Sequence, residues 1–190
     1  MKVDPRPALA VQRAVDAVRR IAPGPAALRF TACLLAAVAA TVALPTVLRA
    51  TPWTYVIVAG MAIMPVLRPD TAWVTAVEVA IVVEWLLSTM VYAEPRGILA
   101  LLAVTALLYA HHTTCALAAA VPITADLAPG VLLNWLIRTA SILVVSIALG
   151  LVALLALPKH LASAAILPLL GLFAAIAAGA VIAYQLHRRR

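Results

Sequence analysis

Apolar residues fall along the chain in long blocks separated by short polar segments or by proline and glycine. A helix needs about 20 mostly apolar residues to cross the hydrocarbon core of a bilayer. The pattern therefore predicts an all-α fold, a polytopic bundle of six transmembrane helices within residues 30–186. The expected spans cover residues 30–48, 53–67, 71–92, 98–120, 131–157 and 163–186.

The second block, residues 53–67, is the shortest and allows two interpretations. It can form a spanning helix with a kink at Pro65, or a re-entrant half-helix that leaves the membrane on the side it entered. Gly60 and Pro65 make it the best candidate for an irregular segment beside a cavity. Six spans place both chain ends on the same side, whereas a re-entrant block would separate them, so we prefer six.

Basic residues gather at the two ends of the chain, which carries a net charge of +7. Residues 1–29 precede the first span, and residues 187–190 form a basic tail. Lys and Arg mark the cytoplasmic flanks of membrane proteins, so both termini are expected to be cytoplasmic. Within the first segment, residues 8–22 have the pattern of a short basic amphipathic helix on the inner leaflet; alternatively, the segment is a solvated leader that only sets orientation.

Composition agrees with a membrane protein, because 66% of the residues are hydrophobic and 11% are charged, against roughly a quarter charged in soluble domains. We expect a multi-pass protein of a bacterial cytoplasmic membrane, with the bilayer rather than nucleic acid as the reason for its positive charge. No polar segment is long enough for a second domain. Cys33 and Cys115 lie inside apolar blocks and predict no disulfide.

Several ionisable residues occur inside the predicted spans, where a central charge costs about 2.5–3.5 kcal/mol and usually finds a partner. Glu78 and Arg138 each lie seven places after the start of a span, and His111 and His112 reach the same depth on the returning span between them. We predict an intramembrane polar cluster in which Glu78 pairs with Arg138 and one histidine joins them. Adjacent helical residues point about 100° apart, so only one histidine is expected to face Glu78. The cluster can serve helix packing, bind a proton or ligand, or reflect snorkelling toward lipid headgroups.

Glu84 forms a second candidate site nearer the outer half of the membrane, level with Thr105 and Tyr109. No cation lies at that depth in the other spans. We therefore expect Glu84 to be protonated and hydrogen-bonded, because a buried unpaired charge is costly. It serves either packing or a proton relay toward the histidines and Glu78.

The remaining chemistry is sparse. His111 and Cys115 share a helix face, but a closed metal site needs four ligands, and His160 and His187 lie in a loop and at the terminus. We therefore expect no metal, haem or other cofactor. Phosphate-binding and zincin motifs are missing from the sequence and no loop is long enough for a catalytic domain, so we expect no enzyme.

The Arg-flanked, Ala-rich blocks, the turn "PVLRPDTAW" and the end "HRRR" resemble small polytopic membrane proteins of actinobacteria, some of them encoded beside MoxR-type ATPases. The resemblance implies an accessory or assembly role in the cytoplasmic membrane. We expect a non-enzymatic accessory, assembly or scaffold component that acts through a membrane-protein partner or a homo-oligomer. The alternative is a small transporter or proton-coupled channel that uses the intramembrane cluster.

Overall fold

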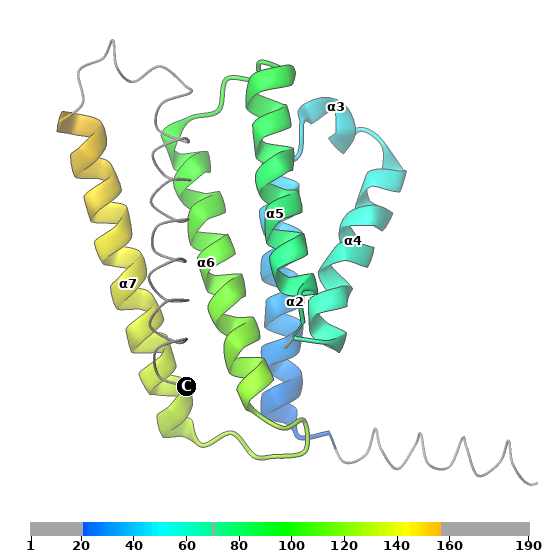
Figure 1. Cartoon of the computed structure of the whole chain (residues 1–190), viewed down its shortest axis with the longest axis vertical. Coiled ribbons are helices and arrows are strands. Elements are labelled where there is room, and N and C mark those ends of the chain that lie inside the picture. The colour runs from blue at the N-terminus through cyan, green and yellow to red at the C-terminus, as the bar shows by residue number, and fades with distance from the viewer. Residues whose placement is uncertain (1–20, 70, 157–190) are drawn as a thin grey trace, which may run out of the picture. The chain divides into compact units, whose positions relative to one another are not determined.

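The computed structural model of the chain describes residues 21–69 and 71–156, and every regular element in these two ranges is helical (Figure 1). The expected amphipathic helix at 8–22 and the expected last span at 163–186 lie outside this part, apart from residues 21 and 22. The elements are α2 (Pro23–Ala43), α3 (Thr46–Arg49), α4 (Pro52–Leu67), α5 (Trp73–Leu86), the π-helical turn η1 (Leu87–Val91), α6 (Ile98–Ala120) and α7 (Pro129–Ala156).

Four helical segments in the described residues are long and apolar enough to cross a membrane, so the helical membrane fold predicted from the sequence is confirmed at this level. The shorter helix α4 has 16 residues and continues through Pro65, so of the two interpretations of this block the structure shows a continuous helix. The four long segments are Pro23–Ala43, Trp73–Val91, Ile98–Ala120 and Pro129–Val152.

The first span differs from the prediction at both ends. Helix α2 begins at Pro23, seven residues before the predicted start at 30, because proline is well suited to a first helical turn, where its missing N–H has no partner to lose. The helix ends at Ala43 instead of 48, because Pro45 forces the preceding residue out of the helical region. Leu44 accordingly has φ −57° and ψ 136°.

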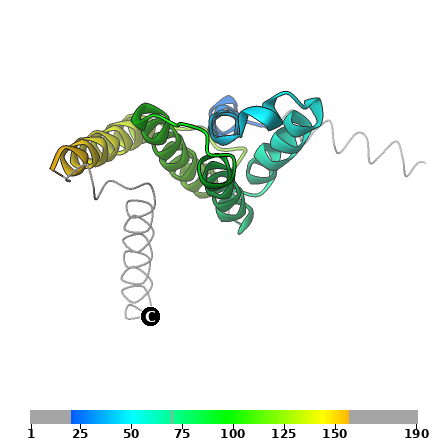
Figure 2. The same cartoon turned by 90° about the horizontal axis from the view of Figure 1, so that it is seen from above.

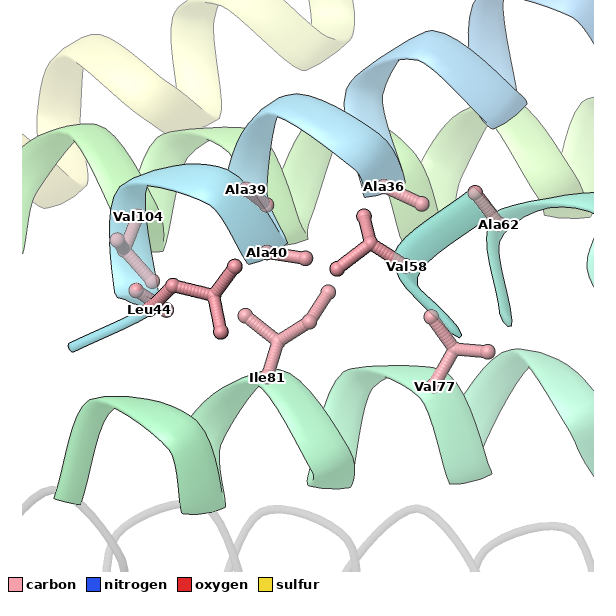
Figure 3. Close-up of a cluster of buried hydrophobic side chains, with 10 residues drawn as sticks. Ala36, Ala39, Ala40, Leu44, Val58, Ala62, Val77, Ile81 and Val104 are labelled. Carbon is pink, nitrogen blue, oxygen red and sulfur yellow. The ribbon is translucent and has the colours of Figure 1, made fainter. Parts of the chain in front are cut away.

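Helix α2 is the centre of the packing, and it contacts α4, α5 and α6 (Figure 2). Its inward side is made of alanines that are almost completely buried, and small side chains let membrane helices approach closely. Figure 3 shows how residues from three other helices close around this side. The cluster comprises Ala36, Ala39, Ala40, Ala43 and Leu44 of α2, Val58 and Ala62 of α4, Val77 and Ile81 of α5, and Val104 of α6.

Among the long helices in the described part of the chain, α7 has the smallest share of buried residues. In its membrane-length segment 6% of the residues are buried, against 33% for α2. The contacts divide the chain into one compact unit that ends at Leu143 and a second that begins at Val144, so residues 144–156 are the helical start of the second unit. In the first unit, Trp135 of α7 donates a hydrogen bond from Nε1 to the backbone oxygen of Thr113 in α6.

Candidate intramembrane polar site

The carboxylate of Glu78 on α5 lies between two histidines of α6. Oε1 is 3.1 Å from Nδ1 of His111 and 3.2 Å from Nδ1 of His112, and Oε2 is also 3.2 Å from Nδ1 of His112. These three residues, here called the Glu–His cluster, include three of the four residues expected to share one layer. The structure brings them together from two helices, with the histidines 33 and 34 residues after Glu78 in the sequence.

Both histidines reach the carboxylate, so the expectation that only one of them would face Glu78 was wrong. The two side chains leave the α6 backbone in different directions, but Nδ1 is the ring nitrogen nearer the backbone and one carboxylate is wide enough to lie between them. His111 is fully buried, whereas the side chain of His112 is 60% exposed. The cluster therefore extends from the interior of the helix packing to its surface.

The buried side of the cluster continues to Cys115. Its Sγ lies 3.4 Å from Nε2 of His111, and both residues belong to the buried side of α6 together with Val104, Thr114 and Ala118. A neutral imidazole has one N–H donor and one acceptor nitrogen. In the tautomer that donates from Nδ1 to Glu78, His111 therefore has Nε2 as the acceptor for the thiol of Cys115. The contacts form a continuous path from His112 through Glu78 and His111 to Cys115.

The sequence predicts a pair between Glu78 and Arg138. Within the described residues the structure does not show this pair. Arg138 is exposed on α7 and makes no hydrogen bond or ion pair with any described residue. Asn134, Arg138 and Ser141 are all exposed and lie within about 60° of one another around the helix, because residues at these spacings recur on one face. We call these three residues the α7 polar stripe. Only Ser141 of the three has a described partner, the backbone oxygen of Ile137 at 2.7 Å.

Glu84 lies on the inward side of α5, where Ile81 and Ser88 are fully buried. Its Oε2 is buried and has no hydrogen-bond partner among the described residues. The expected neighbour Thr105 is exposed and donates to the backbone oxygen of Leu101 in its own helix, and Tyr109 is half-buried without a described hydrogen bond. The expected hydrogen bonding of Glu84 is therefore not seen in this part of the chain.

A second polar cluster, which the sequence interpretation missed, holds the C-terminal end of α2. Arg49 donates to the backbone oxygens of Val42 and Leu44, each at 3.1 Å, and Arg96 donates to the same two oxygens. Pro45 ends α2 and leaves these carbonyls without helical donors, and cations are favoured at a helix C-terminus. We call Arg49 and Arg96 on these two carbonyls the α2 clamp. The available signal was a helix-ending proline close to an arginine.

Glu94 completes the surroundings of the clamp in the segment between η1 and α6. Its carboxylate accepts hydrogen bonds from the Thr46 hydroxyl at 2.6 Å and the Ser88 hydroxyl at 3.0 Å, and it pairs with Arg96 at 2.8 Å. The hydrogen bonds from Thr46, with smaller contributions from Ser88 and Arg96, lower the pKa of Glu94 to about 2. The π-helical turn η1 ends just before this segment, and Ala93 there has a left-handed φ of 49°.

No group of three or more His, Cys, Asp or Glu side chains is arranged to hold a metal ion within the described ranges. A groove of about 340 Å³ between α4 and α5 is lined mainly by apolar side chains, among them Met61, Met64 and Trp73. Gly60 lines this groove too. The Glu–His cluster, rather than this groove, holds the groups that can bind or transfer a proton.

The fold and the site define a class of protein: a helical membrane protein with a carboxylate and two histidines hydrogen-bonded inside its apolar helices. Comparison of the chain with protein-family models, with curated proteins and with solved structures finds no match. The function proposed below therefore depends on the geometry of the described residues.

Proposed function

We propose that this protein is a non-enzymatic component of a membrane assembly, in which its helices dock against another membrane-embedded chain. The observation that carries the proposal is the α7 polar stripe on the least covered of the long helices. A helix that faces only lipid has no use for an arginine near mid-span, where the charge costs about 2.5–3.5 kcal/mol. Polar groups at such positions commonly hydrogen-bond across helix interfaces, which removes that cost.

The proposal includes the topology expected from the sequence. The protein has six spans and lies in a bacterial cytoplasmic membrane with both basic termini on the cytoplasmic side. In this topology α4 is the second span, and its 16 residues extend about 24 Å at 1.5 Å per residue. That is shorter than the hydrocarbon core of about 30 Å, so the bilayer thins locally or neighbouring helices cover its ends.

Purification from membranes in a mild detergent tests the proposal. Wild type is compared with Arg138→Leu, which removes the charge of the stripe, and with Leu136→Ala, a matched change at an exposed position on the opposite side of α7. We expect a defined complex that survives in Leu136→Ala and is lost in Arg138→Leu. If wild type and both variants elute only as the same isolated monomer, the proposed assembly is wrong.

A second candidate function, proton-coupled transport, is favoured by the continuous contacts from exposed His112 through Glu78 to buried His111. Such a chain of proton-binding groups is a common device of membrane pumps and transporters. Reconstitution in vesicles with a trapped pH-sensitive dye tests this function. Proton flux that Glu78→Gln abolishes would support it, whereas absence of flux, or equal flux in wild type and Glu78→Gln, would exclude a role of the cluster in transport.

A further inference from the structure

We infer that two copies of this chain associate through the Glu–His cluster, with Arg138 of each copy completing the cluster of the other. The inference rests on the proposed assembly role and names its partner. The pairing of Glu78 with Arg138 expected from the sequence is then formed between chains instead of within one.

The hydrogen bond between Trp135 and Thr113 sets the level of Arg138 relative to the cluster. Thr113 follows His112 directly in α6, and Arg138 follows Trp135 by three residues in α7. With Trp135 and Thr113 taken as level, three residues along α7 correspond to about 4.5 Å and one residue along the antiparallel α6 to about 1.5 Å. Arg138 therefore lies about 3 Å from the level of His112, well within the reach of the arginine side chain. Two copies inserted with the same orientation carry each residue at the same depth, so this match also holds between copies.

The charge of the Glu–His cluster calls for a cation. Both ring nitrogens of His111 have a neighbour, Nδ1 the Glu78 carboxylate at 3.1 Å and Nε2 the Cys115 thiol at 3.4 Å; in the inferred dimer His111 is the neutral tautomer that donates from Nδ1 and accepts at Nε2. In the inferred dimer His112 is neutral as well, so that the ionised carboxylate leaves the cluster with one negative charge for Arg138 of the other copy to balance. One arginine balances this charge, and a carboxylate has about four lone-pair positions, enough for a further donor beside the two imidazoles.

The two partners of the inferred contact differ in exposure, because Arg138 is exposed whereas the side chain of Glu78 is 19% exposed and is reached from the surface beside it. Within the described residues Arg138 is exposed, and the surface beside Glu78 is formed by His112 and Val82, which are exposed as well. The sequence has seven acidic residues, and only Glu78 and Glu84 lie inside its apolar blocks. Glu84 is on the inward side of α5, so Glu78 is the acid in this chain that a second copy can present to Arg138.

A charge exchange between two differently tagged copies of the full chain tests the inference. One copy carries Arg138→Glu and the other carries Glu78→Arg, and each is also expressed with a differently tagged version of itself. Each variant alone places like charges at both contacts of a symmetric dimer, so its self-association is expected to fall about tenfold below wild type at matched expression. The mixed pair restores opposite charges at both contacts, and its co-purification is expected to return toward the wild-type amount.

Cysteine cross-linking gives a second measurement that does not alter Glu78 or Arg138. In a background with Cys33→Ala and Cys115→Ser, one tagged copy carries Ser141→Cys and the other carries Val82→Cys. These positions follow Arg138 and Glu78 by three and four residues, and both are exposed. We expect a disulfide between the copies. Leu136→Cys, on the opposite side of α7, is the matched control and should give none with Val82→Cys.

The outcomes separate this inference from the proposed function. Restoration in the mixed pair together with the Ser141–Val82 cross-link supports it. If each single variant associates with itself as wild type does, the pairing between copies is refuted. It is also refuted if the two variants are folded but mixing them does not restore their co-purification. A complex with a different membrane protein, without self-association, also refutes the inference but leaves the proposed function in place. A Ser141–Val82 disulfide found only when both cysteines are in one chain refutes it as well.

Discussion

The α2 clamp allows a prediction about redundancy, tested by replacing Arg49 and Arg96 with methionine singly and together. Each arginine donates to the backbone oxygens of both Val42 and Leu44. Removing one arginine therefore leaves a donor on each carbonyl. Removing both leaves two carbonyls without a described donor at the end of α2, where the last helical residue, Ala43, and the following Leu44 are buried.

The magnitudes follow from the hydrogen bonds. A bond from a charged donor contributes about 1.5–3 kcal/mol, and a buried polar group left without a partner costs about 1–3 kcal/mol. Arg96→Met is expected to lower the free energy of unfolding by about 2 kcal/mol, since only 9% of the Arg96 side chain is exposed and its guanidinium also lies over the Trp85 ring, 5.5 Å from the ring centre. Arg49→Met is expected to cost about 1 kcal/mol, because Arg49 lacks these additional contacts. The double variant should lose about 2 kcal/mol more than the sum, one for each unsatisfied carbonyl.

Equilibrium unfolding in mixed micelles, with increasing denaturing detergent, measures these free energies. Arg96→Lys is the control, because it keeps the positive charge but loses the planar group that reaches both carbonyls, and it should lie between wild type and Arg96→Met. Losses that add within about 0.5 kcal/mol in the double variant would show that the two arginines do not share the carbonyls, and the reasoning would fail.

Three further predictions concern single positions. Gly24→Ala should destabilise the fold by about 1–3 kcal/mol because its new Cβ would lie 3.0 Å from Cβ of Leu127, whereas Gly60→Ala meets open space and should be neutral or stabilising; equal melting temperatures would contradict this. Ala93→Gly should raise the melting temperature because it relieves a left-handed backbone strain of about 1 kcal/mol, and a lower melting temperature would refute the strain. The pKa of Glu94 is depressed to about 2, so its ionised form stabilises the fold above the unfolded-state pKa of about 4.3, and this stability is lost as pH falls from about 4.3 toward 2. The melting temperature of wild type should therefore drop in this pH window more than that of Glu94→Gln. Parallel curves of melting temperature against pH would contradict the assignment.

The sequence predicted features that depend on the length of apolar segments and on local backbone rules. The block 98–120 coincides with α6, and the block 71–92 corresponds to α5 with η1. The layer that contains Glu78, His111 and His112 was also predictable, since the helical rise converts sequence position into depth. The early end of α2 at Ala43 could have been predicted from Pro45, although the length of the apolar block concealed it.

Rotation and pairing of the helices were decided only by the tertiary structure. On α5 the buried residue Val77 and the exposed residues Val79 and Val82 are all valines, so hydrophobicity does not indicate which side faces inward. The alanine side of α2 fixes that rotation through close packing, and it thereby brings Glu78 between two histidines. The sequence alone determines a helical membrane chain with acids and bases at one depth. Which of them meet depends on helix rotation, because apolar side chains are equally acceptable toward lipid and toward another helix.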